Sequence, residues 1–300
     1  MNIRDLQYLV AVHDMNSFSK AAERCYVSQP TLSGQLKKLE DELNAPLIER
    51  STRQVLFTAL GEKVVGMARD LLLTADNIRA TARANEDPFS GDFHIGLIPT
   101  VGPFLLPMLM PVLSEEFPDT QFYLYELQAD ELVEKLLKGE IDAAILAKSN
   151  DSQAVQEIPL YSEAMTLAVH NEDELANSEQ SLALSTLNGR SLMMLDDGHC
   201  LRDQVLDVCS SAGAHENVNF KATSMDTLLH MVANGSGVTL VPQLASNKSI
   251  NGVSYLDFDE PKPSREIVMM HRNHCARKPA LSVFADHISQ LVDCNHSVEH

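Results

Sequence analysis

The stretch that decides the fold of the first part of the chain is Ser17-Phe18-Ser19-Lys20-Ala21-Ala22-Glu23-Arg24-Cys25-Tyr26-Val27-Ser28-Gln29-Pro30-Thr31-Leu32-Ser33. Serine is a common N-cap residue, so Ser17 and Ser28 each predict the start of a helix. Pro30 falls in a first helical turn, where its missing N–H costs nothing. We therefore predict a short helix over 18–24, a tight turn, and a longer helix that begins at Gln29.

The longer helix carries an apolar stripe at helical spacing, formed by Leu32, Leu36, Leu39 and Leu43. With another helix predicted over 5–14, the arrangement is typical of a helix-turn-helix. Side chains near its start can reach base edges or phosphates of double-stranded DNA. These candidates are Ser28, Gln29, Pro30, Thr31, Ser33, Gln35, Lys37 and Lys38.

Residues 47–58 predict a two-stranded wing, with Arg50 and Arg53 near backbone phosphates. The alternative is a helical dimerisation hairpin with an ordinary solvated polar face. The helix caps, the tight turn and the wing occur together, and this combination favours DNA binding over the dimerisation hairpin. A long helix over 58–86 follows, with apolar residues along one broad side, and we expect it to pair with a copy of itself.

The charge of the chain is unevenly distributed. Its 300 residues, enough for two or three domains, carry a net charge of −19. Residues 1–83 have a net charge of +1 and the remainder −20. A near-neutral DNA-binding head on an acidic body remains compatible with DNA if the positive charges of the head face one way.

Cysteine usage and hydropathy indicate the compartment. The sequence contains no run of about 18 apolar residues, so we expect no membrane-spanning helix. The first residues do not resemble a signal peptide. Five cysteines, an odd number, are typical of a reducing compartment. We therefore expect a cytoplasmic protein in which any disulfide is transient.

After residue 88 the pattern alternates between strand and helix, which predicts a doubly wound α/β fold with ligands at strand carboxyl ends. The predicted strands lie at 93–98, 122–125, 141–146, 165–169, 191–195, 218–222, 237–241 and 267–270. The predicted helices lie at 102–117, interrupted by Pro107 and Pro111, and at 130–138, 200–210, 224–234 and 279–293.

One of these helices has a cysteine at each end, in the run Asp196-Asp197-Gly198-His199-Cys200-Leu201-Arg202-Asp203-Gln204-Val205-Leu206-Asp207-Val208-Cys209. The two aspartates and the glycine before it are cap-type residues. An intact helix would hold the two Cα atoms roughly 13 Å apart and on opposite faces, whereas a disulfide needs about 7 Å or less. A Cys200–Cys209 disulfide would therefore have to unwind the segment.

Cys200 is the more reactive candidate, because amide dipoles in a first helical turn favour a thiolate and lower the thiol pKa. His199 and Arg202 can add positive charge. The stretch alone leaves open that both cysteines are small buried hydrophobes. A zinc site of His199, Cys200, Cys209 and His215 lacks the usual ligand spacing, and we expect neither metal nor cofactor.

Several motifs resemble the LysR-type transcriptional regulators. The first runs from Phe18-Ser19-Lys20-Ala21-Ala22-Glu23 through Val27-Ser28-Gln29-Pro30-Thr31-Leu32-Ser33 and Lys38-Leu39-Glu40-Asp41-Glu42-Leu43 to Leu47-Ile48-Glu49-Arg50. The second, Gly198-His199-Cys200-Leu201-Arg202-Asp203-Gln204 with Cys209, is more specific and resembles the peroxide-sensing members of that family. The similarity covers about residues 1–290.

This resemblance implies a winged helix-turn-helix over 1–58, a linker helix over 59–87 and a regulatory domain over 88–300. The regulatory domain would have two lobes like a periplasmic binding protein, lobe I at 88–162 and 266–300 and lobe II at 163–265.

The resemblance also implies site roles. Thr100 would help to place peroxide beside Cys200, and Arg265 would stabilise the thiolate, whereas read alone they are a helix cap and a surface ion-pair partner. His199 and Asp203 join the candidate site through the motif. Ala129 departs from relatives that often carry threonine there, so a hydrogen bond of about 1 kcal/mol is absent.

The resulting hypothesis is a non-enzymatic transcription factor that senses hydrogen peroxide, with peroxidatic Cys200 and resolving Cys209, and controls antioxidant genes. Expected partners are promoter DNA, RNA polymerase, reductants of glutaredoxin or thioredoxin type, and further copies of the chain as a dimer of dimers. One rival is a regulator that binds a small organic effector between the lobes without redox chemistry. The other is a thiol peroxidase, which the helix-turn-helix disfavours.

Overall fold

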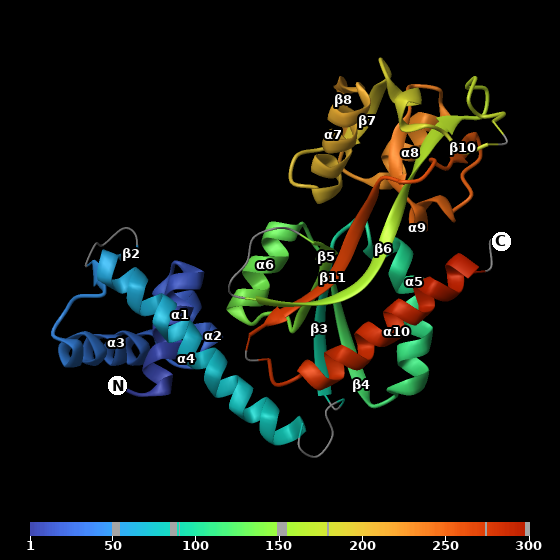
Figure 1. The fold of residues 1–300 in the computed structure, drawn as a ribbon. Helices are drawn as coiled ribbons and strands as arrows, with labels where there is room; N and C mark the ends of the chain where they lie inside the picture. Colours follow the sequence, from blue (N-terminus) through green and yellow to red (C-terminus); the bar gives the residue numbers. More distant parts are fainter. Residues whose placement is uncertain are drawn as a thin grey trace. The chain divides into compact units, whose positions relative to one another are not determined.

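The computed structural model describes residues 1–49, 55–84, 89, 91–148, 155–178, 180–273 and 275–297. The chain forms two compact units, Met1–Asn85 and Glu86–His300, whose elements are labelled in Figure 1. Within the described ranges, no helix is long and apolar enough to cross a membrane.

The first unit is a small helical domain with a β wing. Its elements are α1 (Ile3–Met15), α2 (Phe18–Arg24), α3 (Gln29–Leu43), β1 (Ile48–Glu49), β2 (Leu56–Phe57) and α4 (Ala59–Ala84). The predicted caps are confirmed, because the Ser17 and Ser28 side chains accept the backbone N–H groups of Lys20 and Thr31.

Two sequence predictions for this unit need comment. Leu32, Leu36 and Leu39 are buried as the stripe predicted, but Leu43 is 39% exposed because α3 ends there, before left-handed Asn44. Strands β1 and β2 pair antiparallel as a wing. The predicted phosphate-binding residues Arg50 and Arg53 lie outside the described residues.

The second unit contains the remaining elements. The first group is β3 (Gly91–Leu97), α5 (Gly102–Glu116), β4 (Thr120–Glu126), α6 (Ala129–Lys138), β5 (Ala143–Ala147), β6 (Val155–His170) and the 3₁₀ turn η1 (Leu184–Leu187). The second group is β7 (Ser191–Leu195), α7 (Cys200–Ala212), β8 (His215–Ala222), α8 (Met225–Ala233), β9 (Thr239–Pro242), α9 (Gln243–Ser246), β10 (Val253–Leu256), β11 (Ser264–Arg272) and α10 (Lys278–Ser297).

The strands make one mixed sheet in the order β10-β6-β11-β5-β3-β4, with β9 also paired to β6 and with β7-β8 as a separate parallel pair. Strand β3 runs parallel to β4 and β5, as a doubly wound fold requires. Strands β6 and β11 are long antiparallel partners. The later part of β6 pairs with β9 and β10 instead.

Two hydrophobic cores lie along this sheet. The lobe I core includes Phe93, Leu105, Ile145, Met269 and Phe284, and the lobe II core includes Leu167, Leu192, Leu201, Leu229 and Val241. Because β6 contributes to both cores, it connects the two lobes, as the green-to-yellow strand in Figure 1 shows.

The prediction that Pro107 and Pro111 interrupt a helix is wrong, because α5 is continuous through both. A proline inside a helix costs about 3 kcal/mol, and burial of Leu105, Leu109 and Leu113 in the lobe I core opposes this cost. The sequence patterns also missed α9 and β10. They placed the start of β6 ten residues too late, at 165 instead of Val155.

Candidate functional site

Helix α7 has Cys200 as its first residue and Cys209 in its last turn. Cys200 is half-buried and packs against the lobe I core, whereas Cys209 is buried within the lobe II core. All five cysteines are free. The two sulfurs therefore face different cores, and a disulfide between them requires part of α7 to unwind.

The start of α7 differs from the prediction made for Asp196, Asp197 and Gly198. The N-cap is His199, and its side chain makes no capping hydrogen bond. Gly198 precedes it with a φ of +92°, a left-handed conformation that favours glycine. The two aspartates instead pair with cations, Lys221 in particular, whose Nζ lies 2.9 Å from Asp197 Oδ2.

The expectation of a lowered Cys200 pKa is wrong for this conformation. Burial raises the pKa of the Cys200 thiol, and the negative charges of Asp203 and Asp130 add to that effect. A backbone hydrogen bond at the helix start and the positive charge of Arg265 lower the pKa in opposition. Desolvation of the half-buried sulfur thus outweighs the helix N-terminus.

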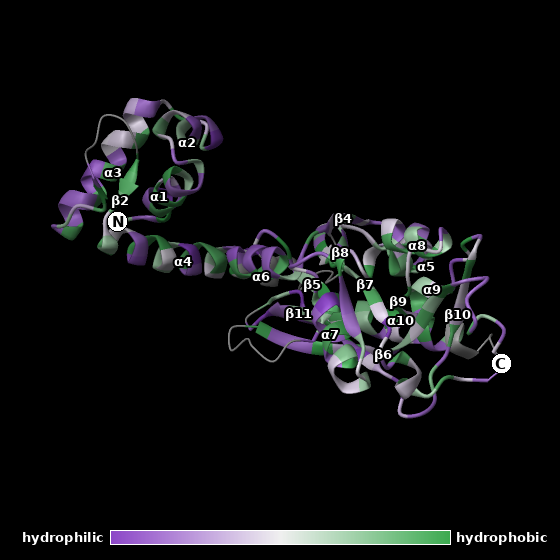
Figure 2. Ribbon diagram, turned by 90° about the horizontal axis from the view of Figure 1, so that it is seen from above, coloured by the Kyte–Doolittle hydropathy of each residue, from purple (hydrophilic) through white to green (hydrophobic). Residues whose placement is uncertain are grey.

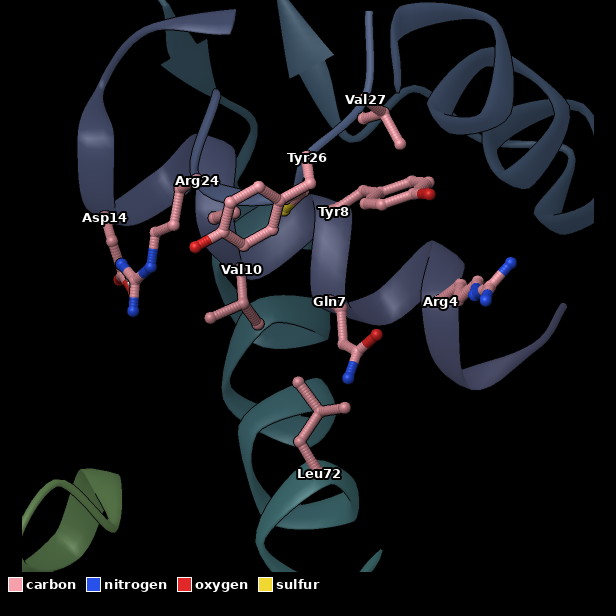
Figure 3. A pocket seen from close by; sticks show the side chains of 11 residues that line it. Arg4, Gln7, Tyr8, Val10, Asp14, Arg24, Tyr26, Val27 and Leu72 are labelled. Carbon is pink, nitrogen blue, oxygen red and sulfur yellow. Dashed lines mark hydrogen bonds and ion pairs between the residues drawn. The ribbon is translucent and has the colours of Figure 1, made fainter. Parts of the chain in front are cut away.

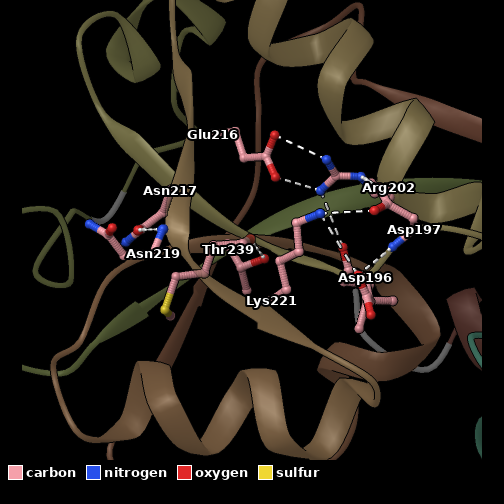
Figure 4. A network of polar contacts seen from close by, with 10 residues as sticks. Asp196, Asp197, Arg202, Glu216, Asn217, Asn219, Lys221 and Thr239 are labelled. Carbon is pink, nitrogen blue, oxygen red and sulfur yellow. Dashed lines mark hydrogen bonds and ion pairs between the residues drawn. The ribbon is translucent and has the colours of Figure 1, made fainter.

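Arg202 does not supply the charge expected beside Cys200. Its guanidinium forms a forked pair with Glu216 of β8, with Nη1–Oε1 and Nη2–Oε2 distances of 2.6 and 3.0 Å. Its Nε lies 3.0 Å from Asp197 Oδ1. Figure 4 shows Arg202 pointing toward Glu216, with Lys221 beside the two aspartates. These contacts fasten the first turn of α7 to β8.

Arg265 lies inside the fold and is not a surface residue. Arg265 is 3% exposed, and its Nε and Nη2 lie 2.9 and 2.8 Å from Glu163 Oε2. Its Nη1 donates to Thr100 Oγ1 and its Nη2 to the Thr100 carbonyl, both at 3.0 Å. Thr100 is buried but does not cap α5, whose N-cap is Val101.

Sequence reasoning missed Glu163. This residue is fully buried opposite Arg265 on β6, and its Oε1 accepts the backbone N–H of Leu244 at 3.0 Å. The sequence carried little signal for this residue, because Glu163 falls before the strand predicted at 165–169, and only its burial shows that the carboxylate requires a partner.

The N-terminus of α6 forms another part of the surroundings of Cys200. Ala129, the first residue of α6, packs against the lobe I core, as Cys200 does. The Gln128 carboxamide lies so close to Gly198 that a Cβ there would fall 2.1 Å from Gln128 Oε1. Gln128 thus spans from the start of α6 to the residues just before Cys200.

The other residues predicted around Cys200 are placed as follows. His199 is 6% exposed, while Asp203 is exposed on α7. Among the described residues, no group of three or more His, Cys, Asp or Glu side chains could hold a metal ion. His199, Cys200, Cys209 and His215 all lie in the described part of the chain and do not form such a group.

The predicted DNA-contacting face of α3 is accessible. Ser28, Gln29, Pro30, Thr31, Lys37 and Lys38 are exposed, and Ser33 and Gln35 are half-buried. Two of the hydroxyls are already engaged, because Ser28 Oγ lies 2.7 Å from Thr31 Oγ1 and caps the helix.

A groove of about 600 Å³ lies elsewhere in the first unit, between α1, the turn after α2, and Leu72 of α4. Figure 3 shows the exposed Tyr26 ring over Val10, with Arg24 beside Asp14. The two charged groups neutralise each other at 3.5 Å. Arg4 also lines the groove, so its wall carries both cationic and anionic side chains.

Comparisons with known proteins agree with this arrangement. Residues 3–62 match the bacterial regulatory helix-turn-helix proteins of the lysR family, and residues 86–293 match the LysR substrate binding domain. The hydrogen peroxide-inducible genes activator of Dickeya chrysanthemi is 48% identical over 274 residues, covering 91% of this chain and 90% of the relative.

Two solved structures are also similar over nearly the whole length. A cysteine-to-aspartate variant of full-length OxyR from Pseudomonas aeruginosa has a TM-score of 0.80 and 35% identity, covering 96% of this chain and 94% of that one. A cysteine-to-serine variant of Corynebacterium glutamicum OxyR with bound H2O2 has a TM-score of 0.67 and 31% identity, with coverages of 97% and 92%. With both of its units matched, the chain belongs to the LysR family of helix-turn-helix transcriptional regulators.

Proposed function

We propose that this regulator senses hydrogen peroxide through Cys200 and a Cys200–Cys209 disulfide, and thereby controls antioxidant genes. The observation that carries the proposal is the orientation of α7, which directs one sulfur to each lobe core. The names of the similar proteins support the choice of oxidant.

The chemistry balances with one peroxide per disulfide. The Cys200 thiolate attacks one peroxide oxygen, so that an S–O bond forms, the O–O bond breaks, and the released hydroxide leaves as water after taking a proton. The Cys209 thiolate then attacks the sulfenic sulfur, so that an S–S bond forms, the S–O bond breaks, and the released hydroxide leaves as water after taking a proton. A dithiol reductant of glutaredoxin or thioredoxin type reopens the bond by thiol–disulfide exchange.

The buried cluster around Arg265 supports the proposed site roles. Arg265 stabilises the Cys200 thiolate and holds Thr100, whose hydroxyl helps to place peroxide. His199 is a buried polar neighbour of the sulfur, and Asp203 is a charged one that disfavours the thiolate. The raised Cys200 pKa limits the reactive fraction at neutral pH, which suits a sensor that must ignore basal peroxide.

The helical unit supports proposals about DNA and assembly. The accessible start of α3 binds promoter DNA. Met67 and Ile78 of α4 are 71% and 67% exposed, while Val65 and Ala68 on another side pack into the unit. Figure 2 shows hydrophilic and hydrophobic residues interspersed along α4. The exposed apolar side pairs with a second copy, and dimers assemble into a tetramer that contacts RNA polymerase.

The remaining assignments belong to the same proposal. The DNA-binding domain covers 1–58, the linker 59–87 and the regulatory domain 88–300, with lobe II at 163–265. The protein works in the reducing cytoplasm, needs no cofactor, and acts as a regulator and not as an enzyme.

The deciding experiment maps the oxidation state of every cysteine before and after a brief peroxide pulse without reductant, and measures promoter output in parallel. We expect one Cys200–Cys209 disulfide, no output from Cys200→Ser, and about one peroxide consumed per chain. Peroxide-dependent output from Cys200→Ser would refute the redox proposal in favour of a bound effector. Many turnovers per chain would indicate a peroxidase. Cys275→Ser is the matched control, because Cys275 also packs against the lobe I core.

A further inference from the structure

The wall of the Cys200 site on the lobe I side is the start of α6. The Gln128 side chain approaches Gly198 within the space that a Cβ would need. Ala129 and Cys200 both pack against the lobe I core. The start of α6 therefore lies against the start of α7, close enough for a charge there to act on Cys200.

Two acidic residues occupy the first turn of α6, Asp130 and Glu131. Both are exposed. Only Asp130 is among the charges that act on the Cys200 thiol; the others are Asp203 from α7 and Arg265 from β11. Within the described part of the chain Asp130 forms no ion pair with a basic side chain that would offset its charge.

We propose that Asp130 is a sensitivity-determining residue, which restrains Cys200 by placing a negative charge across the lobe boundary from the sulfur. This inference rests on the proposed peroxide chemistry of Cys200. Asp130 and Arg265 then act in opposite directions on one sulfur.

The same charge has a second consequence that does not involve protonation. A negative group at the site repels anionic thiol reagents and leaves neutral ones unaffected. Hydrogen peroxide is neutral at physiological pH. Asp130 therefore favours neutral oxidants over anionic ones at Cys200.

The test compares Asp130→Asn with Glu131→Gln in the full-length reduced protein. Both variants remove one carboxylate from the first turn of α6, so any loss of helix-dipole stabilisation is matched. Cys200 is alkylated with neutral iodoacetamide in one series and with anionic iodoacetate in the other. Peptide mapping measures the rate of each reaction. In both reactions the thiolate sulfur forms the S–C bond and iodide leaves.

We expect Asp130→Asn to shift the pH profile of Cys200 alkylation to lower pH and to raise its rate at pH 7 by about twofold to fourfold. The iodoacetate rate should rise more than the iodoacetamide rate, and both gains should shrink near 1 M salt, where the Debye length is about 3 Å. Glu131→Gln should behave as the unsubstituted protein. A purely structural role of Asp130 would not change the ratio of the two reagents.

The rate of Cys200 oxidation by peroxide is measured in the same proteins. This measurement distinguishes failure of the Asp130 proposal from failure of the peroxide-sensing proposal. If Asp130→Asn leaves both the pH profile and the reagent ratio unchanged, or if Glu131→Gln changes them equally, the assignment of Asp130 is wrong. If peroxide fails to oxidise Cys200 in the unsubstituted protein, the sensing proposal is wrong whatever the alkylation shows. Support for both requires the peroxide rate to rise in Asp130→Asn along with the alkylation rate.

Discussion

Arg265 and Glu163 face each other across β11 and β6, and both are almost completely buried. Two guanidinium nitrogens contact one carboxylate oxygen at 2.9 and 2.8 Å, while the other oxygen accepts the Leu244 amide. The pair lies where β6 passes from the lobe I core to the lobe II core. It therefore joins the Cys200 site to the strands that connect the lobes.

Removing one member of this pair should be more damaging than removing both. Glu163→Gln leaves a buried guanidinium without its counter-ion, at a cost of about 3–5 kcal/mol. Glu163→Leu combined with Arg265→Met should recover much of that stability, because no charge is left buried. Urea unfolding measures both. A double variant as unstable as the single one would show that the pair itself stabilises the fold.

Cys200 reactivity should not recover in that double variant. Arg265 lowers the Cys200 pKa, so its loss leaves only the backbone hydrogen bond to oppose burial and the acidic charges, and the pKa rises further. The alkylation rate of Cys200 at neutral pH should therefore be lower in the double variant than in the unsubstituted protein. The two rates should become equal once the pH exceeds the Cys200 pKa of both proteins. Equal Cys200 alkylation rates in the two proteins at neutral pH would contradict the proposed role of Arg265.

Oxidation should unwind α7 only when both sulfurs are present. Amide hydrogen exchange over 200–212 should be slow in the reduced protein and accelerate after a peroxide pulse, because the disulfide requires the Cα atoms to approach within about 7 Å. Cys209→Ser should form the sulfenic acid yet keep its slow exchange. An intact α7 in the disulfide form would contradict the geometric basis of the switch.

Restoring a hydroxyl at Ala129 should increase the peroxide rate. Ala129 and Cys200 both pack against the lobe I core, and one hydrogen bond to peroxide is worth about 1 kcal/mol, or roughly fivefold in rate. Ala129→Thr is compared with Ala129→Val, which has nearly the same shape but no hydroxyl. Stopped-flow oxidation of Cys200 gives both rates. A similar gain in both variants would point to packing instead of hydrogen bonding.

Local patterns predicted the elements well and the polar partners poorly. Ser17, Ser28 and the leucines of α3 act within one or two helical turns, so their roles can be read from sequence spacing. The Arg202–Glu216 pair joins α7 to β8, and Arg265 contacts Thr100 from the far end of the chain. Such pairs depend on how strands assemble, which periodicity does not encode.

The Cys200 pKa shows the same limit. Its position in a first helical turn was readable from the sequence, but its burial was not. Desolvation arises because Cys200 packs against the lobe I core, which only the folded chain brings to the start of α7. Predicting the sign of the shift therefore required the tertiary structure.

The Arg202–Glu216 pair should set how readily α7 unwinds. Arg202 holds the pKa of Glu216 below its usual range, so this stabilisation is present at neutral pH and is lost as the pH falls through the lowered value. Glu216→Gln removes the charge at neutral pH and should speed disulfide closure from the sulfenic acid by about fivefold, if about 1 kcal/mol of helix anchoring is lost. The first oxidation step should change less.

The matched control for that prediction is Glu174→Gln. Glu174 also pairs with an arginine, Arg190, at 2.7 Å, but lies outside α7 and β8. Rapid quenching with a sulfenic acid trap separates the two steps, because it captures the intermediate before Cys209 reacts. If Glu216→Gln closes no faster than Glu174→Gln, the first turn of α7 is not what limits the switch, and the barrier must lie in extracting Cys209 from the lobe II core.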